Sequence, residues 1–379
     1  MKKILFLTGT RADYGKLKPL IKSVQDSKIF QCYLFITGMH TLKEFGDTKS
    51  EVLADNYNNI HIYINQIIEE PMDLVLANTI NGFSRYIREL KPDLILVHGD
   101  RVEALAAAIS GAINNIIVAH VEGGEVSGTI DESIRHAITK LAHVHFVSNE
   151  DSRRRLIQLG ELKDSIFVIG SPDIDLILSG SMLHIDRIKQ RYEIDFDEYA
   201  VVLYHPVTTE LEFIENNVSE LVDALIQSGL NYVVINPNND HGYRSIIQEY
   251  KRFKNNKKFK VFPSIRFEYF IEILKNSKFI IGNSSVGIHE APVVGVPTIN
   301  VGTRQNNRFP YKSIINTNNS NVDIINGIKV ALKMIVKPTL HFGNGNSASA
   351  FLSILKSERF WSISKQKVFV EINQINEGE

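Results

Sequence analysis

"LILVHGDRVEALAAAISGAINNIIVAHVEGG" (residues 94–124) carries the pattern that decides the fold. Two continuously apolar runs rich in Ile and Val lie on either side of a segment that is predicted to be a helix. Strands without apolar–polar alternation are typical of a parallel sheet that is covered on both faces, because every side chain is then buried. The order strand, helix, strand therefore predicts an α/β domain with a parallel sheet.

The same alternation extends along the whole chain. Other candidate strands are KILFLTG, CYLFITG, VHFVS and IFVIG in the first half, and YAVVLYH, YVVINP, KFIIGNSS and PTINVG in the second. The first series ends near a turn-prone stretch, 169–180. We therefore expect two Rossmann-like, doubly wound domains, residues 1–172 and 173–355, that face one another across a cleft.

The composition narrows the possible function classes. Of 379 residues, 44% are hydrophobic and 22% are charged, and the net charge of −1 argues against a broad surface for nucleic acid or membrane. One cysteine, Cys32, allows no intrachain disulfide. Without a CxxC or HExxH motif we expect no dedicated metal site, and we expect no cofactor. The apolar run that begins the chain is too short for a signal peptide, so we expect a soluble cytoplasmic protein.

Many of the apolar runs end in residues that carry chemical groups. In an open parallel sheet, ligands bind at the carboxyl ends of the strands, so these groups should crowd one rim in each domain. Polar residues must follow strands somewhere, but the whole set together indicates a site in the cleft. The set comprises Thr8–Arg11, Gly38–His40, His98–Arg101, His120–Glu122, His205, Asn236–Asp240 and Asn283–Ser285.

Three carboxylates are candidates for acid–base chemistry. Glu122 ends a predicted strand before two glycines that allow close approach of another group. Asp100 either caps the helix that follows it or faces the site, and Asp131 either faces the site or pairs with Arg135 one turn on. Crowding and burial would raise the pKa of at least one of them, so that an acid and a base coexist near neutral pH.

The neighbouring Glu132 has a structural interpretation. Thr129 and Glu132 fit the capping box T-x-x-E at the start of an amphipathic helix. Because glutamine also completes a capping box, Glu132→Gln is expected to be mild.

Two loops have the character of an anion site. In "LTGTRADYGK" (7–16) a turn with glycine places Arg11 ahead of a helix, although the GxGxxG and P-loop patterns are missing. In "IIGNSSVGIHEAP" (280–292), Ser284 and Ser285 would present hydroxyl and N–H groups at a helix N-terminus, where they bind an anion or simply cap the helix. Arg304 is suited to neutralise a phosphate.

The motifs, taken in order, resemble those of the hydrolysing UDP-N-acetylglucosamine 2-epimerases, in particular the bacterial branch that feeds sialic acid synthesis. They are GTRADYGKL, TGMH, HGDR-EALA, EGGE-SGT-D-SIRH, HPVTTE, GNSS-GI-EAP and GTRQ. The resemblance covers nearly the whole chain, and the block at 122–136 is its most specific part. It implies the GT-B fold, a last helix within 356–379 that crosses back to the first domain, and a homodimer or homotetramer.

The resemblance also implies a reaction. UDP would leave C1 of the sugar together with the C2 proton, water would add to the resulting 2-acetamidoglucal, and N-acetylmannosamine and UDP would be released. Asp100, Glu122 and Asp131 would be the acid–base groups, with Asp100 or Glu122 favoured at C2. The other implied roles are His205 and Arg11 on the diphosphate, helped by Gly282, Ser284, Ser285 and Arg304; Glu290 on the ribose; Asn238 on the nucleotide; the backbone near Ile265 on the uracil; and His40 and Arg101 near the sugar or the carboxylates.

One position departs from the resemblance, and three other functions compete with it. The motif GIxEA is expected to hold arginine, and this chain has His289. If that arginine supports the diphosphate, binding here is weaker or more pH-dependent; if it points outward, nothing changes. The alternatives are the same chemistry on a UDP-2,4-diacetamido or GDP-linked sugar, a GT-B glycosyltransferase, and a sugar-nucleotide binding protein without turnover. Three carboxylates in one cleft favour elimination.

Overall fold

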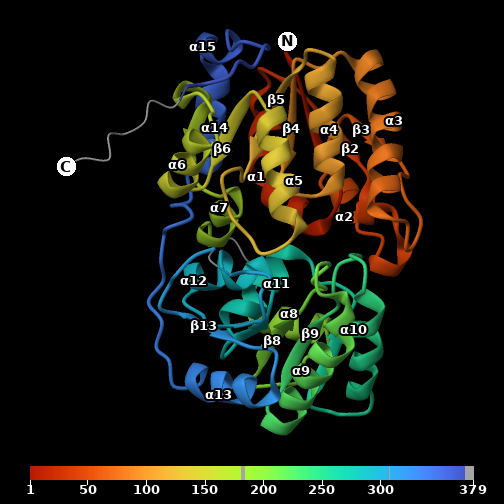
Figure 1. Ribbon diagram of the computed structural model, residues 1–379, viewed down its shortest axis with the longest axis vertical. Helices are drawn as coiled ribbons and strands as arrows, with labels where there is room; N and C mark the ends of the chain where they lie inside the picture. The colour runs from red at the N-terminus through yellow and green to blue at the C-terminus, as the bar shows by residue number, and fades with distance from the viewer. Residues whose placement is uncertain (181–183, 307, 372–379) are drawn as a thin grey trace, which may run out of the picture.

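The computed structural model describes residues 1–180, 184–306 and 308–371, and it contains two parallel sheets, one above the other in Figure 1. The first has the strand order β3-β2-β1-β4-β5-β6-β7 and the second β10-β9-β8-β11-β12-β13. The order of each sheet reverses beside its first strand, as in a doubly wound fold. The prediction of two Rossmann-like domains is confirmed.

The strands are β1 (Lys3–Thr8), β2 (Gln31–Ile36), β3 (Ile60–Ile62), β4 (Leu94–His98), β5 (Ile117–Val121), β6 (Val144–Val147), β7 (Ile166–Val168), β8 (Ala200–Leu203), β9 (Tyr232–Ile235), β10 (Phe259–Phe262), β11 (Ile280–Gly282), β12 (Thr298–Val301) and β13 (Ile314–Thr317). The helices of the first half are α1 (Arg11–Ser27), α2 (Lys49–Ala54), α3 (Met72–Leu90), α4 (Val102–Ile113), α5 (Ile130–Leu141), α6 (Glu150–Gln158) and α7 (Pro172–Leu178). Those of the second half are α8 (Ile185–Arg191), α9 (Ile214–Ser228), α10 (Tyr243–Tyr250), α11 (Phe267–Lys275), α12 (Glu290–Val294), α13 (Asn321–Ala331), α14 (Ser347–Lys356) and α15 (Glu358–Trp361).

Burial on both faces of the sheet explains the continuously apolar strands. Successive residues of β4 enter two different cores: Leu94 and Leu96 pack with α1 and α14, whereas Ile95 and Val97 pack with α3, α4 and α5. Both faces of β4 are therefore dry, and an alternating pattern would place a polar group in one of the cores.

The chain returns to the first domain before it ends. Phe351 and Leu355 of α14, and Phe360 of α15, are buried in the core of the first sheet. The return therefore begins by residue 347, earlier than the expected crossing after about residue 355, because the apolar face of α14 already packs on α1. The last residues of the expected segment, 372–379, lie outside the described part of the chain.

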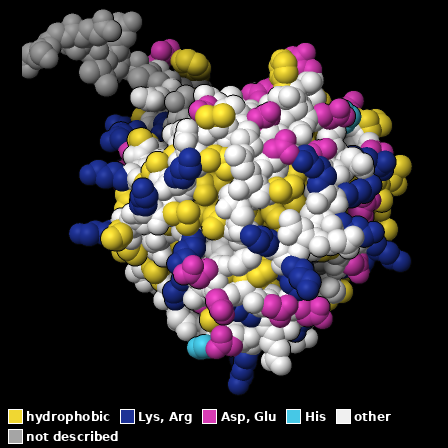
Figure 2. Space-filling model, turned by 90° about the horizontal axis from the view of Figure 1, so that it is seen from below, with side chains coloured by type: hydrophobic (Ala, Val, Ile, Leu, Met, Phe, Trp, Pro, Cys, Tyr) yellow, Lys and Arg dark blue, Asp and Glu magenta, His cyan; other side chains and the backbone are white. Residues whose placement is uncertain are grey.

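The surface of the second domain is mixed in character. Viewed from below in Figure 2, Lys and Arg side chains alternate with acidic and apolar ones over this end of the molecule. In the described residues, no helix is long and apolar enough to cross a membrane.

Candidate active site

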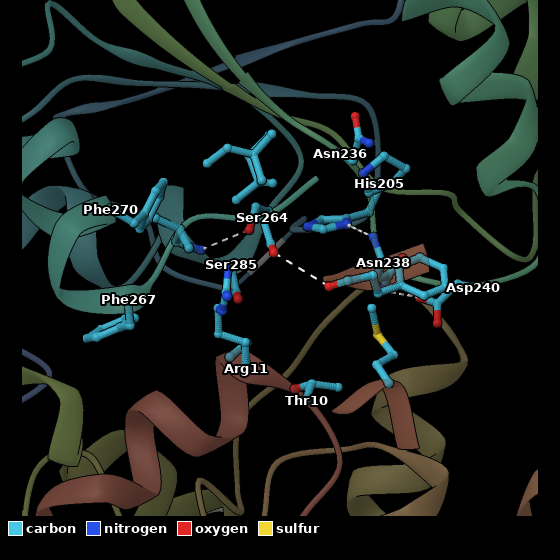
Figure 3. Close-up of a pocket in the computed structure, with 18 of the residues that line it drawn as sticks. Thr10, Arg11, His205, Asn236, Asn238, Asp240, Ser264, Phe267, Phe270 and Ser285 are labelled. Atoms are coloured by element: carbon cyan, nitrogen blue, oxygen red, sulfur yellow. Dashed lines mark hydrogen bonds between the residues drawn. The ribbon is translucent and has the colours of Figure 1, made fainter. Parts of the chain in front are cut away.

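The carboxyl ends of the central strands of both sheets meet at one cavity of about 280 Å³. Arg11 follows β1, Asp100 follows β4, His205 follows β8 and Ser284 follows β11. These are the positions where each sheet reverses its strand order, and ligands bind there in doubly wound folds. The expected site residues that line the cavity are Arg11, Asp100, Arg101, Asp131, His205, Asn238, Ile265, Ser284, Ser285, Glu290 and Arg304. Figure 3 shows several of them around the cavity.

Three expected site residues lie outside the cavity lining. His40 is fully buried, and its ring nitrogens lie 3.0 Å from Thr8 Oγ1 and 2.7 Å from Thr48 Oγ1. Burial lowers the pKa of His40 to about 3, so its ring is neutral and supports the wall of the cavity. Glu122 and Gly282 lie behind the lining and are described below.

Asp100 and Asp131 stand on the first domain's side of the cavity with opposite pKa shifts. Burial alone would raise the pKa of Asp100, but the guanidinium groups of Arg135, Arg308 and Arg304 outweigh it and lower that pKa. Burial, and then the charge of Asp100, raise the pKa of Asp131. Two carboxyl groups with diverging pKa values are the arrangement that separates a base from an acid.

The structure decides between the two roles that the sequence left open for Asp131. Arg135 is 1% exposed and donates to Asp100, whereas Asp131 accepts from Arg304 of the other domain at 3.1 Å, so of the two alternatives for Asp131 the structure has the one in which it faces the site. The side chain of Arg135 points into the first domain and is almost fully buried there. Asp131 lies at the first turn of α5 and points across the cleft.

The predicted capping box is wrong in its details. Thr129 caps α5 by accepting from the N–H of Asp131, at 3.3 Å. The carboxylate of Glu132 accepts from the N–H of Ser127, at 2.6 Å, and so closes the preceding loop instead of the cap. Glu132 remains a structural group, and it lies outside the cavity lining.

His205 is held as a neutral donor. Its Nδ1 accepts from the backbone N–H of Asn238 at 3.1 Å, which leaves Nε2 to carry the hydrogen. Burial, and then the charge of Arg304, lower the pKa of His205 to about 3. A neutral imidazole of this kind donates a hydrogen bond to a phosphate oxygen and has no proton to give at neutral pH.

Part of the cavity wall is apolar. Met39, Phe45, Ile265, Phe267 and Phe270 line the cavity together with Ser264 and Pro263, and Figure 3 shows the rings of Phe267 and Phe270 on one side of it. Apolar and aromatic walls with a few polar groups fit a planar base, and the charged lining residues fit a sugar diphosphate.

Glu122 lies beneath the cavity, in a buried cluster with Lys16. It has a φ of +64°, a left-handed backbone conformation that is uncommon outside glycine and that often marks functional positions. Its Oε1 accepts from Lys16 at 2.9 Å and from Ser171 at 2.8 Å, and its Oε2 lies 3.2 Å from Nε2 of His98. Burial would raise the pKa of Glu122, but the charges of Lys16 and His98 hold it well below its usual value.

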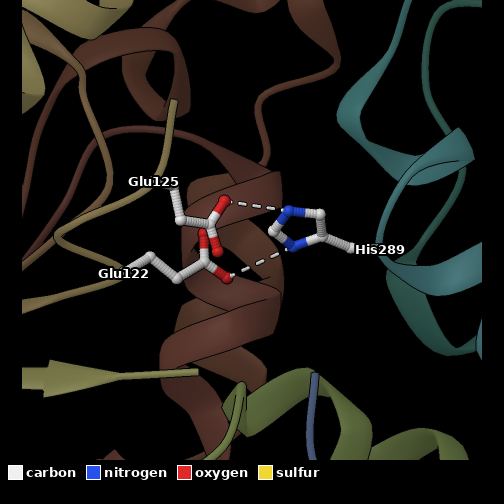
Figure 4. A group of neighbouring side chains, drawn as sticks. All are labelled: Glu122, Glu125 and His289. Carbon is white, nitrogen blue, oxygen red and sulfur yellow. Dashed lines mark ion pairs between the residues drawn. The ribbon is translucent and has the colours of Figure 1, made fainter. Parts of the chain in front are cut away.

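A second buried group, drawn in part in Figure 4, joins the two domains. Nε2 of His289 lies 2.9 Å from Glu125 and its Nδ1 lies 4.0 Å from Glu122, while Arg308 donates to Glu125 at 2.6 Å. Glu122, Glu125 and His289 bring ligand atoms within 4.8 Å of one another. However, Lys16 and Arg308 already compensate both carboxylates, so a divalent cation would face two positive charges.

Comparison with known proteins places the chain in a family. The family model described as UDP-N-acetylglucosamine 2-epimerase matches residues 22–356. A Neisseria meningitidis serogroup B protein named UDP-N-acetylglucosamine 2-epimerase is 45% identical over 377 residues, which cover 98% of this chain and 100% of that protein. The chain belongs to the UDP-N-acetylglucosamine 2-epimerase family.

Two other members extend the comparison. A Legionella pneumophila protein named UDP-N,N'-diacetylbacillosamine 2-epimerase (hydrolyzing) is 34% identical over 94% of this chain and 96% of its own length. The crystal structure of the Methanocaldococcus jannaschii UDP-GlcNAc 2-epimerase, solved in complex with UDP-GlcNAc and UDP, has a TM-score of 0.81 at 20% identity and covers 94% of this chain and 99% of that one. This likeness confirms the predicted GT-B-like fold.

The side chain of His289 neither lines the cavity, where it could support a diphosphate, nor points outward into solvent. It is fully buried, its ring stacks on that of Phe342 at 4.2 Å, and it lies outside the cavity lining. In this member of the UDP-N-acetylglucosamine 2-epimerase family, the position therefore belongs to the contact between the domains.

Two residues of the site escaped the sequence analysis. Lys16 lines the cavity one turn after the Arg11 loop, and Glu125 pairs with Arg308 at the domain contact. Asp240, one of the expected strand-end residues, pairs with Arg101 at 3.0 Å. The motif blocks contain Lys16 and Glu125, but nothing in the sequence indicates which partner each one meets across the cleft.

Gly282→Ala should lower stability and weaken UDP binding. Gly282 has a φ of +140°, and an added Cβ would lie 2.1 Å from the carbonyl oxygen of Leu203. Because that strand end leads into His205, relief of the clash would displace the cavity wall. We expect a loss of about 1–3 kcal/mol in the free energy of unfolding, measured by denaturant titration, and a higher Kd for UDP. Gly180→Ala is the control: the φ of Gly180 is also positive, but its Cβ would meet nothing within 4 Å.

Proposed function

We propose that this protein is a hydrolysing epimerase that converts UDP-N-acetylglucosamine and water into N-acetylmannosamine and UDP. The observation that carries the proposal is the pair Asp100 and Asp131, which have opposite pKa shifts and line a cavity whose apolar and cationic residues also suit a nucleotide. Inversion at C2 needs a base on one face of the sugar and an acid on the other.

Asp100 is the proposed base. Arg135 keeps it ionised, and departure of the diphosphate from C1 acidifies the C2 hydrogen, so that a weak but well-placed base suffices. As the C1–O bond breaks, the electrons of the C2–H bond form the C1=C2 double bond of 2-acetamidoglucal, and Asp100 takes the proton.

Asp131 is the proposed acid for the second half of the reaction. Its raised pKa favours the protonated form, which delivers a proton to the opposite face of C2 while water adds its oxygen to C1. The carboxylate that Asp131 becomes can take the surplus proton of that water, and the proton held by Asp100 is released to solvent. Arg304, Arg11, Ser284, Ser285 and the neutral His205 are the proposed ligands of the departing UDP.

Glu122 acts from beneath the cavity in this proposal. It lies outside the cavity lining, and Lys16 stabilises its anionic form. We therefore propose that Glu122 contributes negative charge beneath the site and does not itself transfer a proton at C2. Glu290, Asn238, Ile265 and Arg101 line the same cavity and keep their proposed contacts with the nucleotide and sugar.

A diacetamido sugar is the second candidate substrate. The Legionella relative is named for UDP-N,N'-diacetylbacillosamine, and the cavity residues named above suit the diphosphate of either substrate. The higher identity to the Neisseria protein, 45% against 34%, favours UDP-N-acetylglucosamine. We further propose that the product serves sialic acid synthesis in the cytoplasm, as the sequence resemblance implies.

Proton NMR of the purified protein in D₂O tests the proposal. With UDP-N-acetylglucosamine we expect UDP and free N-acetylmannosamine with deuterium at C2. UDP-N-acetylmannosamine as the product would instead show a non-hydrolysing epimerase. If this substrate survives while UDP-N,N'-diacetylbacillosamine is consumed, the second candidate is correct.

A homodimer or homotetramer is also proposed. The stretch beside the edge strand β3 exposes Ile64 and Ile67, each 70% accessible, together with Leu74. An apolar stretch at a sheet edge is a common contact between subunits. Sedimentation equilibrium should give a mass of two or four chains, and Ile64→Asp with Ile67→Asp should lower it.

A further inference from the structure

A buried group of carboxyls lies beneath the cavity and has too few partners for its charge. We call Lys16, Glu122, Ser171, Asp173 and Glu290 the carboxyl cluster. Its members come from α1, the end of β5, the residue that precedes α7, α7 itself and α12, and each is at most 7% exposed. Lys16 and Glu290 also line the cavity, so the charge of the cluster acts directly on a ligand.

The contacts of Ser171 require an extra proton. Its Oγ lies 2.8 Å from Oε1 of Glu122 and 2.5 Å from Oδ1 of Asp173. A serine hydroxyl has one hydrogen, so it can donate to only one of two carboxyl oxygens. The other carboxyl must bring a proton of its own to this bridge, because two oxygens without a hydrogen between them would repel at such a distance.

The third carboxyl, Glu290, adds to the same imbalance. Its Oε1 lies 3.8 Å from Nζ of Lys16, which lies 2.9 Å from Glu122. Among the described residues, Oε2 of Glu290 and Oδ2 of Asp173 have no hydrogen-bond partner. Within the cluster itself, three carboxylates therefore share the positive charge of one lysine, which gives a net charge of −2 before the outer partners of Glu122, His98 and His289, are counted.

Taken together, the surroundings of Glu290 oppose ionisation of its carboxyl group. Burial raises its pKa to about 8; Lys16 acts against this rise, and the carboxyl groups of Asp173 and Glu122 add to it. Two histidines also face Glu122: His98 lies 3.2 Å from its Oε2, and His289 lies 4.0 Å from its Oε1. At neutral pH the cluster thus holds a proton, in agreement with the count at Ser171.

We propose that the pair Asp173 and Glu290 holds one proton beside Lys16, that Ser171 links this pair to the ionised Glu122, and that Asp173 is a positioning residue which makes the binding of a diphosphate depend on that proton. The inference rests on the proposed function only in taking UDP as the ligand. With the proton bound, the cluster has a net charge of −1; without it, the charge is −2 and repels the diphosphate. Binding of UDP therefore stabilises the protonated cluster.

Asp173→Asn separates this proposal from a merely structural role. The amide donates an N–H to Ser171 and so replaces the protonated carboxyl, while Glu122, Glu290 and Lys16 sum to −1 without any proton. The variant should imitate the protonated cluster at every pH, and its affinity for UDP should no longer depend on pH.

Calorimetric titration of the full-length protein with UDP tests this, at pH 7 and pH 9 and in buffers of different ionisation enthalpy. For the parent protein we expect uptake of up to one proton and a Kd about tenfold higher at pH 9. For Asp173→Asn we expect a Kd at pH 7 like that of the parent and a change below about threefold between the two pH values. The titration of UDP itself is common to both proteins, so their difference isolates the cluster.

The matched control is Asp175→Asn, two residues along the same helix. Asp175 accepts from the backbone N–H groups of Ser347 and Ala348 and lies outside the cavity lining, so the pH dependence should persist. Parental binding without proton uptake would overturn the inference, even if Asp173→Asn failed to fold. So would an Asp173→Asn variant that keeps the pH dependence. If UDP binds with proton uptake but no N-acetylmannosamine forms, the proposed reaction fails and this inference stands.

Discussion

Asp131→Asn should lower kcat by about 10²- to 10⁴-fold and leave the Kd for UDP within about threefold. The amide keeps the size of the side chain and a contact with Arg304, but it has no acid proton to return to C2. In the parent, kcat should fall as the pH rises through the raised pKa of Asp131, because the acid form is then lost. NMR analysis of reactions quenched at successive times gives kcat, and calorimetry gives the affinity for UDP.

The control for this variant is the adjacent residue. Glu132→Gln removes a carboxylate one position along α5 that accepts a loop N–H from Ser127, lies 3.4 Å from His136 and is outside the cavity lining. It should change kcat by less than about threefold. An Asp131→Asn variant with a kcat near that of the parent would show that the assignment of the acid is wrong.

Glu125→Gln should lower the free energy of unfolding by about 3–5 kcal/mol. Glu125 is 3% exposed, and its charge is shared by Arg308 and His289 at the contact of the two domains. Removal of the carboxylate leaves the guanidinium of Arg308 buried without the counter-charge to which it is hydrogen-bonded. Urea denaturation followed by circular dichroism measures the loss.

Two further variants show whether burial causes this effect. Arg154→Met breaks an exposed ion pair with Asp151 and should cost less than about 0.5 kcal/mol. Replacing both partners, Glu125→Leu with Arg308→Met, should recover much of the loss, because no charge is then left buried alone. Equal effects of Glu125→Gln and Arg154→Met would contradict the role given to Glu125.

The central strands were predictable and several edge strands were not. β4 and β5 are buried on both faces, so their apolar runs are unmistakable. β3, β10 and β13 lie at the edges of the sheets, are three or four residues long, and are partly exposed. Their sequences mix polar and apolar residues like a loop, and only their backbone pairing with a neighbour identifies them as strands.

The site was predictable as a set of residues at the ends of strands, but their pairing was not. A strand end places Asp100 or His205 at a rim whatever the rest of the chain does. Which arginine meets Asp131 depends on how the two domains approach, so the sequence left a pair with the near neighbour Arg135 open and did not indicate Arg304 as its partner. Lys16 was missed for the same reason, since its partners come from β5 and α12.

The packing of α14 on the first sheet means that the first domain is not continuous along the chain. Its core includes Phe6 near the start and Phe351 and Phe360 near the end, and the second sheet lies between them in sequence. During synthesis, the second domain is therefore complete on the ribosome while the first still lacks its last helices. We expect the half that is translated later to reach its native fold first, with the earlier half waiting for the closing segment.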